Sequence, residues 1–284
     1  MKGKVALVTG SSRGVGKGVA LVLGEAGATV YVTGRTIRGN TNKWGIPGTI
    51  HDTADEVTAR GGRGVPVRCD HSSDDDTKHV IATIKRREGR LDILVNNAFG
   101  GEDGKRKILT YDEFPFWAHD LDEWWYRMFT AYLRSTLAVT YHALPLIMQR
   151  EGGLVVNTLW WNRGSYLYDL FFDIASCAVG RMAYGLSLEL HSKKTTVVAL
   201  SPGWTRTENM TDVPEKVLAK TADPEFVGRA VVHLALDSRS HSKSGRIIEI
   251  GELAREYGFR NVDGRMIDYH ADISRGRRKG FPPD

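Results

Sequence analysis

Cysteine is scarce in this chain of 284 residues, which contains only Cys69 and Cys177. Two cysteines are too few for a disulfide framework or a recognisable metal-binding pattern, so we expect no metal site. Cys69 lies in an apolar segment, and we expect it to be a buried small hydrophobic residue. The composition therefore excludes the class of small disulfide-rich proteins.

Long hydrophobic runs are also missing, since no window approaches the ~18 uninterrupted apolar residues of a membrane span. The opening residues MKGKVALVTG run directly into a strand pattern with no charged-then-apolar leader, which predicts a cytoplasmic location. The net charge of +5 is modest, and part of it lies in the tail segment RGRRKG. Without a basic stripe carrying interleaved aromatic residues, we expect neither a nucleic-acid nor a membrane partner.

Short β-branched runs alternate with helical patterns along the whole chain. Strands are predicted at Lys4–Thr9, Thr29–Thr33, Gly64–Cys69, Leu91–Val95, Leu154–Thr158, Thr195–Leu200 and Arg246–Ile250. Helices are predicted at Gly14–Gly27, His51–Arg60, Asp74–Arg87, Leu121–Arg150, Phe172–His191 and Pro224–Leu236. This alternation predicts an α/β fold of the Rossmann type: one doubly wound parallel sheet of about seven strands, with helices on both faces.

No internal repeat, low-complexity tract or linker interrupts this rhythm, which predicts a single domain over residues 1–284. Residues 38–50, rich in Gly, Asn and Thr, are predicted to form a loop near the end of the second strand. Residues 100–120 form a long insertion after the fourth strand, and residues 252–284 form a C-terminal tail. Because long loops at the carboxyl ends of parallel strands commonly cover ligands, the insertion is expected to cover a substrate.

The segment VTGSSRGVG follows the first predicted strand and opens the first predicted helix. Its T-G-x-x-x-G-x-G spacing lets backbone amides approach a diphosphate at a helix N-terminus, where unpaired N–H groups favour anions. The pattern predicts a dinucleotide site. Its cofactor-binding residues are Thr9, Gly10, Ser12, Arg13, Gly14, Val15 and Gly16.

The end of the second predicted strand indicates which dinucleotide is bound. A free ribose 2′-hydroxyl usually meets an Asp or Glu there, but this chain offers Gly34 and Arg35. Arg13 adds a second guanidinium, and two guanidinium groups suit a 2′-phosphate by charge and bidentate geometry. NADP(H) is therefore predicted over NAD, with two solvated surface arginines as the alternative.

Further motifs follow the other strands in order: CD (Cys69-Asp70), NNA (Asn96-Asn97-Ala98) and SPG (Ser201-Pro202-Gly203). Together with the glycine pattern they resemble the short-chain dehydrogenase/reductase family, and the tail GELAREYGFRNVDGRMIDY is similar to one branch of it. The resemblance implies that Asp70 contacts the adenine region, and that Asn96 and Ala98 lie beside the cofactor. It also places Pro202 and Gly203 near the nicotinamide, with Thr207 contacting its carboxamide.

The resemblance also implies a proton relay that this chain lacks. Family members use a Tyr, a Lys four residues later, a Ser about thirteen residues before the Tyr and an Asn in the preceding helix. The Tyr and Lys positions fall on Phe172 and Ser176, the Ser position on Leu159 or Trp160, and the Asn position on Tyr132. Phe172 has no hydroxyl, and Ser176 cannot supply the cationic field that lowers the pKa of a phenol.

Aromatic and acidic residues replace the relay. The predicted substrate pocket consists of Trp160, Trp161, Phe172, Phe116 and Trp117. Tyr168, Asp173 and Tyr132 are the candidate proton donors. Aromatic rings edged with carboxylates suit a flat, hydrophobic or cationic small molecule. Core packing or subunit contact is the alternative for the rings, and a first-turn helix carboxylate is the alternative for Asp173.

Three functions stay open at this point. The first is an NADPH-dependent reductase that transfers hydride to an iminium-like acceptor, which needs less acid assistance than a ketone. The second is a non-redox cyclase, dehydratase or isomerase on the same scaffold. The third is an inactive NADP-binding subunit that completes a hetero-oligomer with an active paralogue. The resemblance also implies assembly as a homodimer or homotetramer through the predicted helices at 121–150 and 172–191.

Overall fold

The computed structural model describes residues 1–40, 45–100, 115–161, 163, 166–167, 169–210 and 214–268. Its centre is a parallel sheet of seven strands in the order β3-β2-β1-β4-β5-β6-β7. The strands are β1 (Val5–Val8), β2 (Thr29–Gly34), β3 (Arg63–Arg68), β4 (Ile93–Asn96), β5 (Leu154–Thr158), β6 (Thr196–Ser201) and β7 (Ile247–Glu249). The predicted doubly wound Rossmann-type sheet is thus confirmed.

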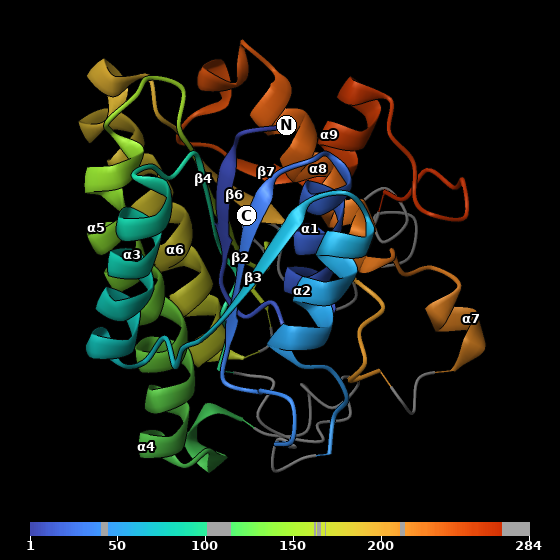
Figure 1. The fold of residues 1–284 in the computed structure, drawn as a ribbon. Helices are drawn as coiled ribbons and strands as arrows, with labels where there is room; N and C mark the ends of the chain where they lie inside the picture. The colour runs from blue at the N-terminus through green and yellow to red at the C-terminus, as the bar shows by residue number, and fades with distance from the viewer. Residues whose placement is uncertain are drawn as a thin grey trace.

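Helices cover both faces of the sheet (Figure 1). One face carries α1 (Gly14–Glu25), α2 (Ile50–Ala59), α8 (Pro224–Leu236) and α9 (Ile250–Tyr257). The other carries α3 (Asp74–Glu88), α5 (Ser135–Ile147) and α6 (Leu170–Glu189). Successive residues of β1 alternate between the two cores, with Ala6 in the first and Leu7 in the second. Burial on both sides explains why the strand sequences are almost continuously apolar.

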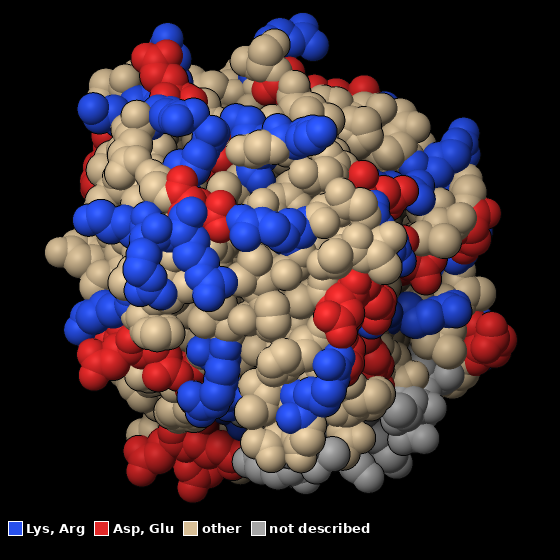
Figure 2. Space-filling model, viewed as in Figure 1, with Lys and Arg blue, Asp and Glu red and all other residues tan. Residues whose placement is uncertain are grey.

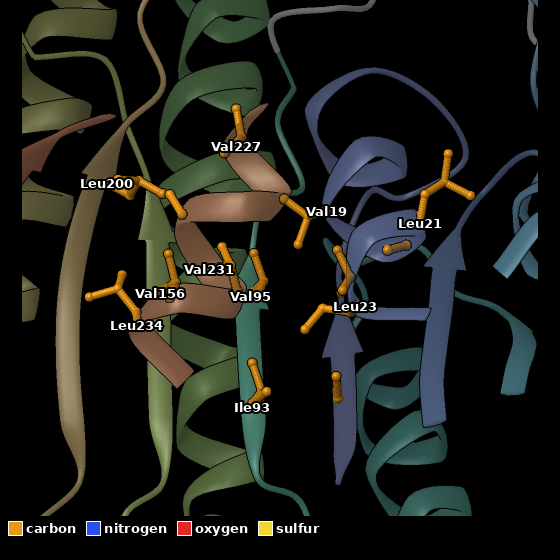
Figure 3. Close-up of a cluster of buried hydrophobic side chains, with 14 of the residues drawn as sticks. Val19, Leu21, Leu23, Ile93, Val95, Val156, Leu200, Val227, Val231 and Leu234 are labelled. Carbon is orange, nitrogen blue, oxygen red and sulfur yellow. The ribbon is translucent and has the colours of Figure 1, made fainter. Parts of the chain in front are cut away.

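Close packing of α1 against α8 fixes the helix that carries the glycine loop at its N-terminus. Val19 of α1 and Val231 of α8 lie between these helices and the central strands (Figure 3). A Cβ on Gly18 would lie 2.2 Å from the carbonyl carbon of Pro224, and one on Gly228 would lie 2.7 Å from the Gly18 oxygen. The two helix backbones therefore touch, and a larger residue at either glycine would force them apart.

The helix predicted over residues 121–150 is confirmed over residues 121–147, but its middle part is a π-helix and not an α-helix. The structure has α4 (Leu121–Trp124), then the π-helix η3 (Trp125–Arg134), then α5, which ends at Ile147. Within α4 and η3 the buried residues are Trp124, Met128 and Tyr132, with exposed fractions of 4%, 2% and 3%. Their spacing of four keeps large side chains on one line toward the core, which suits turns wider than the 3.6 residues of an α-helix.

The predicted C-terminal tail begins within a helix. The last strand ends at Glu249, and Ile250, which was predicted to end it, is the first residue of α9. This helix runs to Tyr257 and so includes the start of the predicted tail. Ile250, Leu253 and Ala254 are buried at helical spacing, so this helix was visible in the sequence. A second missed element is α7 (Glu215–Leu218). Of the predicted insertion at 100–120, residues 101–114 lie outside the described part, and η2 (Phe116–Ala118) follows them.

Charges of both signs are interspersed on the face of the molecule seen in Figure 2. The ion pairs of the protein include Arg63 with Glu88 and Arg134 with Asp74. Within the described residues, no helix combines the length and the apolar character needed to cross a bilayer.

Candidate active site

The strand order reverses between β1 and β4, and the carboxyl ends of these two strands meet. Thr9 Oγ1 accepts hydrogen bonds from the backbone N–H groups of Asn97 at 2.8 Å and Ala98 at 2.9 Å. The side-chain amide of Asn97 donates to the carbonyl oxygens of Thr9 and Gly10, both at 3.1 Å. The structure therefore brings Thr9, Gly10 and Ala98 together. Asn97, which we had not assigned a role, is the residue that ties them, and its place in the NNA motif was the available signal.

Asn96 lies behind this junction, 3% exposed. Its Nδ2 donates to Thr140 Oγ1 of α5 and to Asn157 Oδ1 of β5, both at 2.8 Å. One amide thus links β4, β5 and α5 below the site. These contacts support the end of the central strand β4.

The glycine loop is shaped for close approach. Gly10 and Gly14 have φ of +63° and +57°, a region that side-chain-bearing residues rarely adopt. A Cβ on Gly16 would lie 2.4 Å from the Gly10 oxygen, so the loop cannot carry a side chain there. The Gly14 N–H at the start of α1 donates to Glu208 Oε2 at 2.8 Å. This donor therefore holds an anionic oxygen, and the loop, with Ser12 buried beside it, fits a dinucleotide diphosphate.

Arg13 joins the glycine loop to the loop after β2. Its Nε donates to the Pro47 oxygen at 3.0 Å, and its Nη2 donates to Thr36 Oγ1 at 3.1 Å and the Gly48 oxygen at 2.9 Å. The guanidinium of Arg13 thus lies at the end of β2, in contact with Thr36, the residue after Arg35. Thr36, a further candidate donor at this end, was missed because its hydroxyl carries no motif.

Asp70 lies at the end of the neighbouring strand β3. Burial opposes its ionisation, but hydrogen bonds from the Ser72 hydroxyl and backbone N–H outweigh burial and lower the pKa of Asp70, helped by the nearby Arg35. Arg35 and Asp70 are therefore close enough to influence each other across the ends of β2 and β3. That is the region where an adenosine would lie against such a sheet.

A buried histidine supports these strand ends. His71 Nε2 lies 2.8 Å from Thr33 Oγ1, and its Nδ1 lies 3.4 Å from Cys69 Sγ. Burial lowers the pKa of His71 to about 4, so the ring is neutral at pH 7. Cys69 is buried as predicted, and burial raises the pKa of its thiol to about 12. These side chains form a structural layer beneath the site.

Phe172 and Ser176 lie in the first turns of α6, which Asp169 caps by accepting the Phe172 N–H at 3.0 Å. The Phe172 ring centroid is 5.5 Å from that of Phe99, and Phe99 meets Tyr132 edge-on at 5.1 Å. We call Phe99, Tyr132 and Phe172 the aromatic wall. Phe99 was missed by the sequence argument, although it directly follows NNA.

Tyr132 is held in a specific way within the aromatic wall. Its hydroxyl donates to the Thr158 carbonyl oxygen at 3.0 Å, and its side chain is buried. Burial raises the pKa of Tyr132 well above its usual range, and the nearby Ser176 hydroxyl opposes this only in part. Ser176 is fully buried, and its Oγ forms no hydrogen bond of regular geometry within the described residues. A proton donor at Tyr132 would therefore be a weaker acid than an ordinary tyrosine.

The remaining predicted pocket residues are placed differently from one another. The backbone N–H of Trp161 donates to Ser201 Oγ at 3.2 Å, which sets this half-buried residue beside the end of β6 and the Pro202-Gly203 turn. Phe116 packs on Phe171 with centroids 5.3 Å apart. Trp117 is 82% exposed, so its ring faces solvent and not an enclosed wall.

The other proposed donors and contacts are also distributed. Asp173 Oδ1 accepts the Leu167 N–H at 3.1 Å, which anchors the segment before α6. Tyr168 lies outside the described residues. Thr207 packs against the glycine loop, its Cγ2 lying 3.3 Å from the position of a Cβ on Gly14. Half-buried Val15 and Trp160 complete the predicted set.

Comparisons with known proteins agree with this geometry. The family model for short chain dehydrogenases matches residues 4–218. Dehydrogenase/reductase SDR family member 1 of Mus musculus is 34% identical over 285 residues, covering 95% of this chain and 87% of the mouse protein.

Solved structures share the fold. A short chain dehydrogenase of Mycobacterium thermoresistibile superposes with a TM-score of 0.75 at 23% identity, covering 91% of this chain and 88% of its own. A metagenomic short-chain oxidoreductase in complex with NADP superposes with a TM-score of 0.66 at 21% identity, covering 87% and 95%. The chain belongs to the short-chain dehydrogenase/reductase family of oxidoreductases.

Proposed function

We propose that the protein is an NADP(H)-dependent oxidoreductase whose substrate is flat and carries positive charge at the acceptor carbon, as an iminium does. The observation that carries this proposal is the aromatic wall, with Phe172 and Ser176 in the positions where the family resemblance implies Tyr and Lys. When bound, NADPH supplies a hydride.

The choice of cofactor rests on the charges at the ends of β2 and β3. Arg13 is fixed at this end by Thr36 and Gly48, and Arg35 follows β2 directly. Two guanidinium groups match a 2′-phosphate, and the position of a ribose-binding carboxylate after β2 is taken by Arg35. The NADP bound by the metagenomic oxidoreductase supports the same choice.

The choice of substrate rests on what the aromatic wall offers and lacks. The faces of Phe99 and Phe172 attract a cation, and a cationic acceptor carbon needs no proton from the protein as it is reduced. The Tyr132 hydroxyl already donates to Thr158, so it is poorly placed to assist a developing alkoxide. Tyr168 and Asp173 remain the proposed sources of a proton for any later step.

Single-turnover stopped-flow spectroscopy tests this function. The protein, loaded with NADPH, is mixed with a cyclic iminium compound and with a ketone of the same ring size. We expect oxidation of NADPH by the iminium compound at a rate about 100-fold or more above that with the ketone, the range that general acid catalysis contributes. Equal rates would contradict the charged-acceptor proposal. Substrate conversion without NADPH oxidation would favour the non-redox alternative, and activity only after mixing with an active relative would favour the subunit alternative.

We also propose self-association through α5 and α6. Large apolar side chains are exposed on both helices: Leu137, Tyr141, Ile174, Tyr184 and Leu188. Both helices pack on the same face of the sheet, so a second copy of the chain is the simplest partner that would cover them. Light scattering that gives the monomer mass of 31.6 kDa at micromolar concentration would contradict this.

A further inference from the structure

Glu208 has no role in the function proposed above, yet it lies on the centre of the cofactor site. Its Oε2 accepts the Gly14 N–H at 2.8 Å, and the preceding residue, Thr207, packs its methyl group on Gly14. The residues from Thr205 to Met210, here the 205–210 segment, follow β6 and therefore reach the glycine loop from the far half of the sheet. The side chain of Glu208 is half-buried in this contact.

The Glu208 carboxylate and a cofactor diphosphate would bind the Gly14 N–H by the same kind of interaction. The first N–H groups of a helix have no partner within the helix and attract anions through the helix dipole. A carboxylate oxygen and a diphosphate oxygen satisfy such a donor in the same way, with a charge-assisted hydrogen bond. Gly14 has a single N–H, so the Glu208 carboxylate and a diphosphate oxygen compete for the same donor.

We infer that Glu208 is an internal competitor of the cofactor diphosphate. In the cofactor-free protein its carboxylate holds the 205–210 segment on the N-terminus of α1, and a dinucleotide binds only by displacing it. The apparent affinity for the dinucleotide is then reduced by the fraction of molecules in which the contact is closed. This inference rests on the proposed cofactor site, and it identifies Glu208 as a residue that lowers the affinity of that site for the dinucleotide.

On the opposite side of the glycine loop, Arg13 is held by Pro47, Gly48 and Thr36. These three partners are neutral oxygens, which do not repel a phosphate as the Glu208 carboxylate does. The Glu208 side therefore has to open. Binding of the adenosine 2′-phosphate part of the cofactor should accordingly be independent of Glu208.

Calorimetric titration of three proteins tests the inference: wild type, Glu208→Gln and Glu215→Gln. The last removes an exposed carboxylate in α7 and is the matched control for loss of one negative charge. We expect Glu208→Gln to bind NADPH about tenfold more tightly, equivalent to about 1.4 kcal/mol. Glu215→Gln should bind as wild type does. Adenosine 2′-monophosphate, which has no diphosphate, should bind all three proteins within about twofold.

Amide hydrogen exchange of the cofactor-free protein gives a second readout that does not depend on NADPH. We expect faster exchange of the Gly14 N–H in Glu208→Ala than in wild type, at unchanged exchange in α6. Equal NADPH affinity in wild type and Glu208→Gln, or weaker affinity in the variant, would overturn the inference and leave the proposed cofactor intact. Failure of every variant to bind NADPH would overturn both, whereas binding by Glu208→Gln alone would support both.

Discussion

The two halves of the candidate active site match the family's sequence pattern to different degrees. At the ends of β1 and β4, the glycine loop, Thr9 and the NNA motif follow the family's sequence pattern, and the Thr9 hydroxyl accepts hydrogen bonds from the backbone of Asn97 and Ala98. At the start of α6 and within η3, the positions that the resemblance assigns to the family's polar residues carry Phe172, Ser176 and Tyr132. The first half is built mainly from backbone groups, whereas the chemistry of the second depends on individual side chains.

The replacements in the second half compensate one another in volume. Ser176 has no exposed surface, and Tyr132 reaches it from η3 with its hydroxyl bonded to Thr158. A short side chain at 176 is thus matched by a large ring at 132, which leaves the core filled. Because close-packed interiors resist added volume, the catalytic position cannot revert at one residue alone.

The largest expected effect comes from restoring three of the four relay residues. Phe172→Tyr with Ser176→Lys supplies the phenol and the ammonium, but the lysine would collide with Tyr132. We expect the triple variant that also carries Tyr132→Asn to reduce a simple ketone about 1,000-fold faster than wild type, within the range of general acid catalysis. The double variant should be destabilised by about 1–3 kcal/mol through overpacking. NADPH oxidation and urea unfolding measure the two effects, and a double variant as active and stable as the triple one would contradict the packing argument.

The next effect concerns the glycine loop, which belongs to the half of the site built mainly from backbone groups. In Gly16→Ala the new Cβ would lie 2.4 Å from the Gly10 oxygen. The loop must therefore shift, and its backbone amides move away from the proposed position of the diphosphate. We expect NADPH binding to weaken about 100-fold, comparable to loss of two charge-assisted hydrogen bonds. Gly185→Ala in α6 is the control, because a Cβ there meets no atom within 4 Å. Calorimetry that shows equal NADPH affinity in the two variants would refute the importance of close approach.

A smaller effect tests the choice between NADP(H) and NAD(H). Arg35→Ser removes a guanidinium beside Asp70 at the end of β2, and we expect NADPH to bind about 30-fold more weakly with NADH changed by less than about threefold. Arg38→Ser is the control, since Arg38 pairs with Asp52 and Asp55 at 2.8 Å each. Fluorescence titration with both cofactors measures the difference, and parallel losses for NADPH and NADH would exclude 2′-phosphate recognition.

The smallest effect concerns His71, which lies in the buried layer beneath the ends of β2 and β3. Folded His71 takes up a proton only below about pH 4, whereas the unfolded chain does so below about 6.5. Its contribution to stability is therefore complete above pH 6.5 and is lost as the pH falls toward 4. Between pH 6.5 and 5.5 we expect wild type to lose about 1 kcal/mol more of its unfolding free energy than His71→Gln. Urea unfolding at the two pH values measures this, and identical losses would mean that His71 titrates normally.

The sequence by itself determined the sheet, its seven strands and the course of the glycine loop. Apolar strands alternate with helices, and positive φ at Gly10 and Gly14 requires glycine, so local patterns specify these features. The family resemblance also predicts that Phe172 and Ser176 occupy the usual Tyr and Lys positions, and that assignment stays a prediction.

Only the tertiary structure decided which side chains meet. Tyr132 and Ser176 lie far apart in the chain, and the contact between Gly14 and Glu208 spans 194 positions. The π-helical turns of η3 likewise depend on which rings face the core. Such contacts arise from how the elements pack, and no local spacing encodes the distance between residues brought together from opposite halves of a sheet.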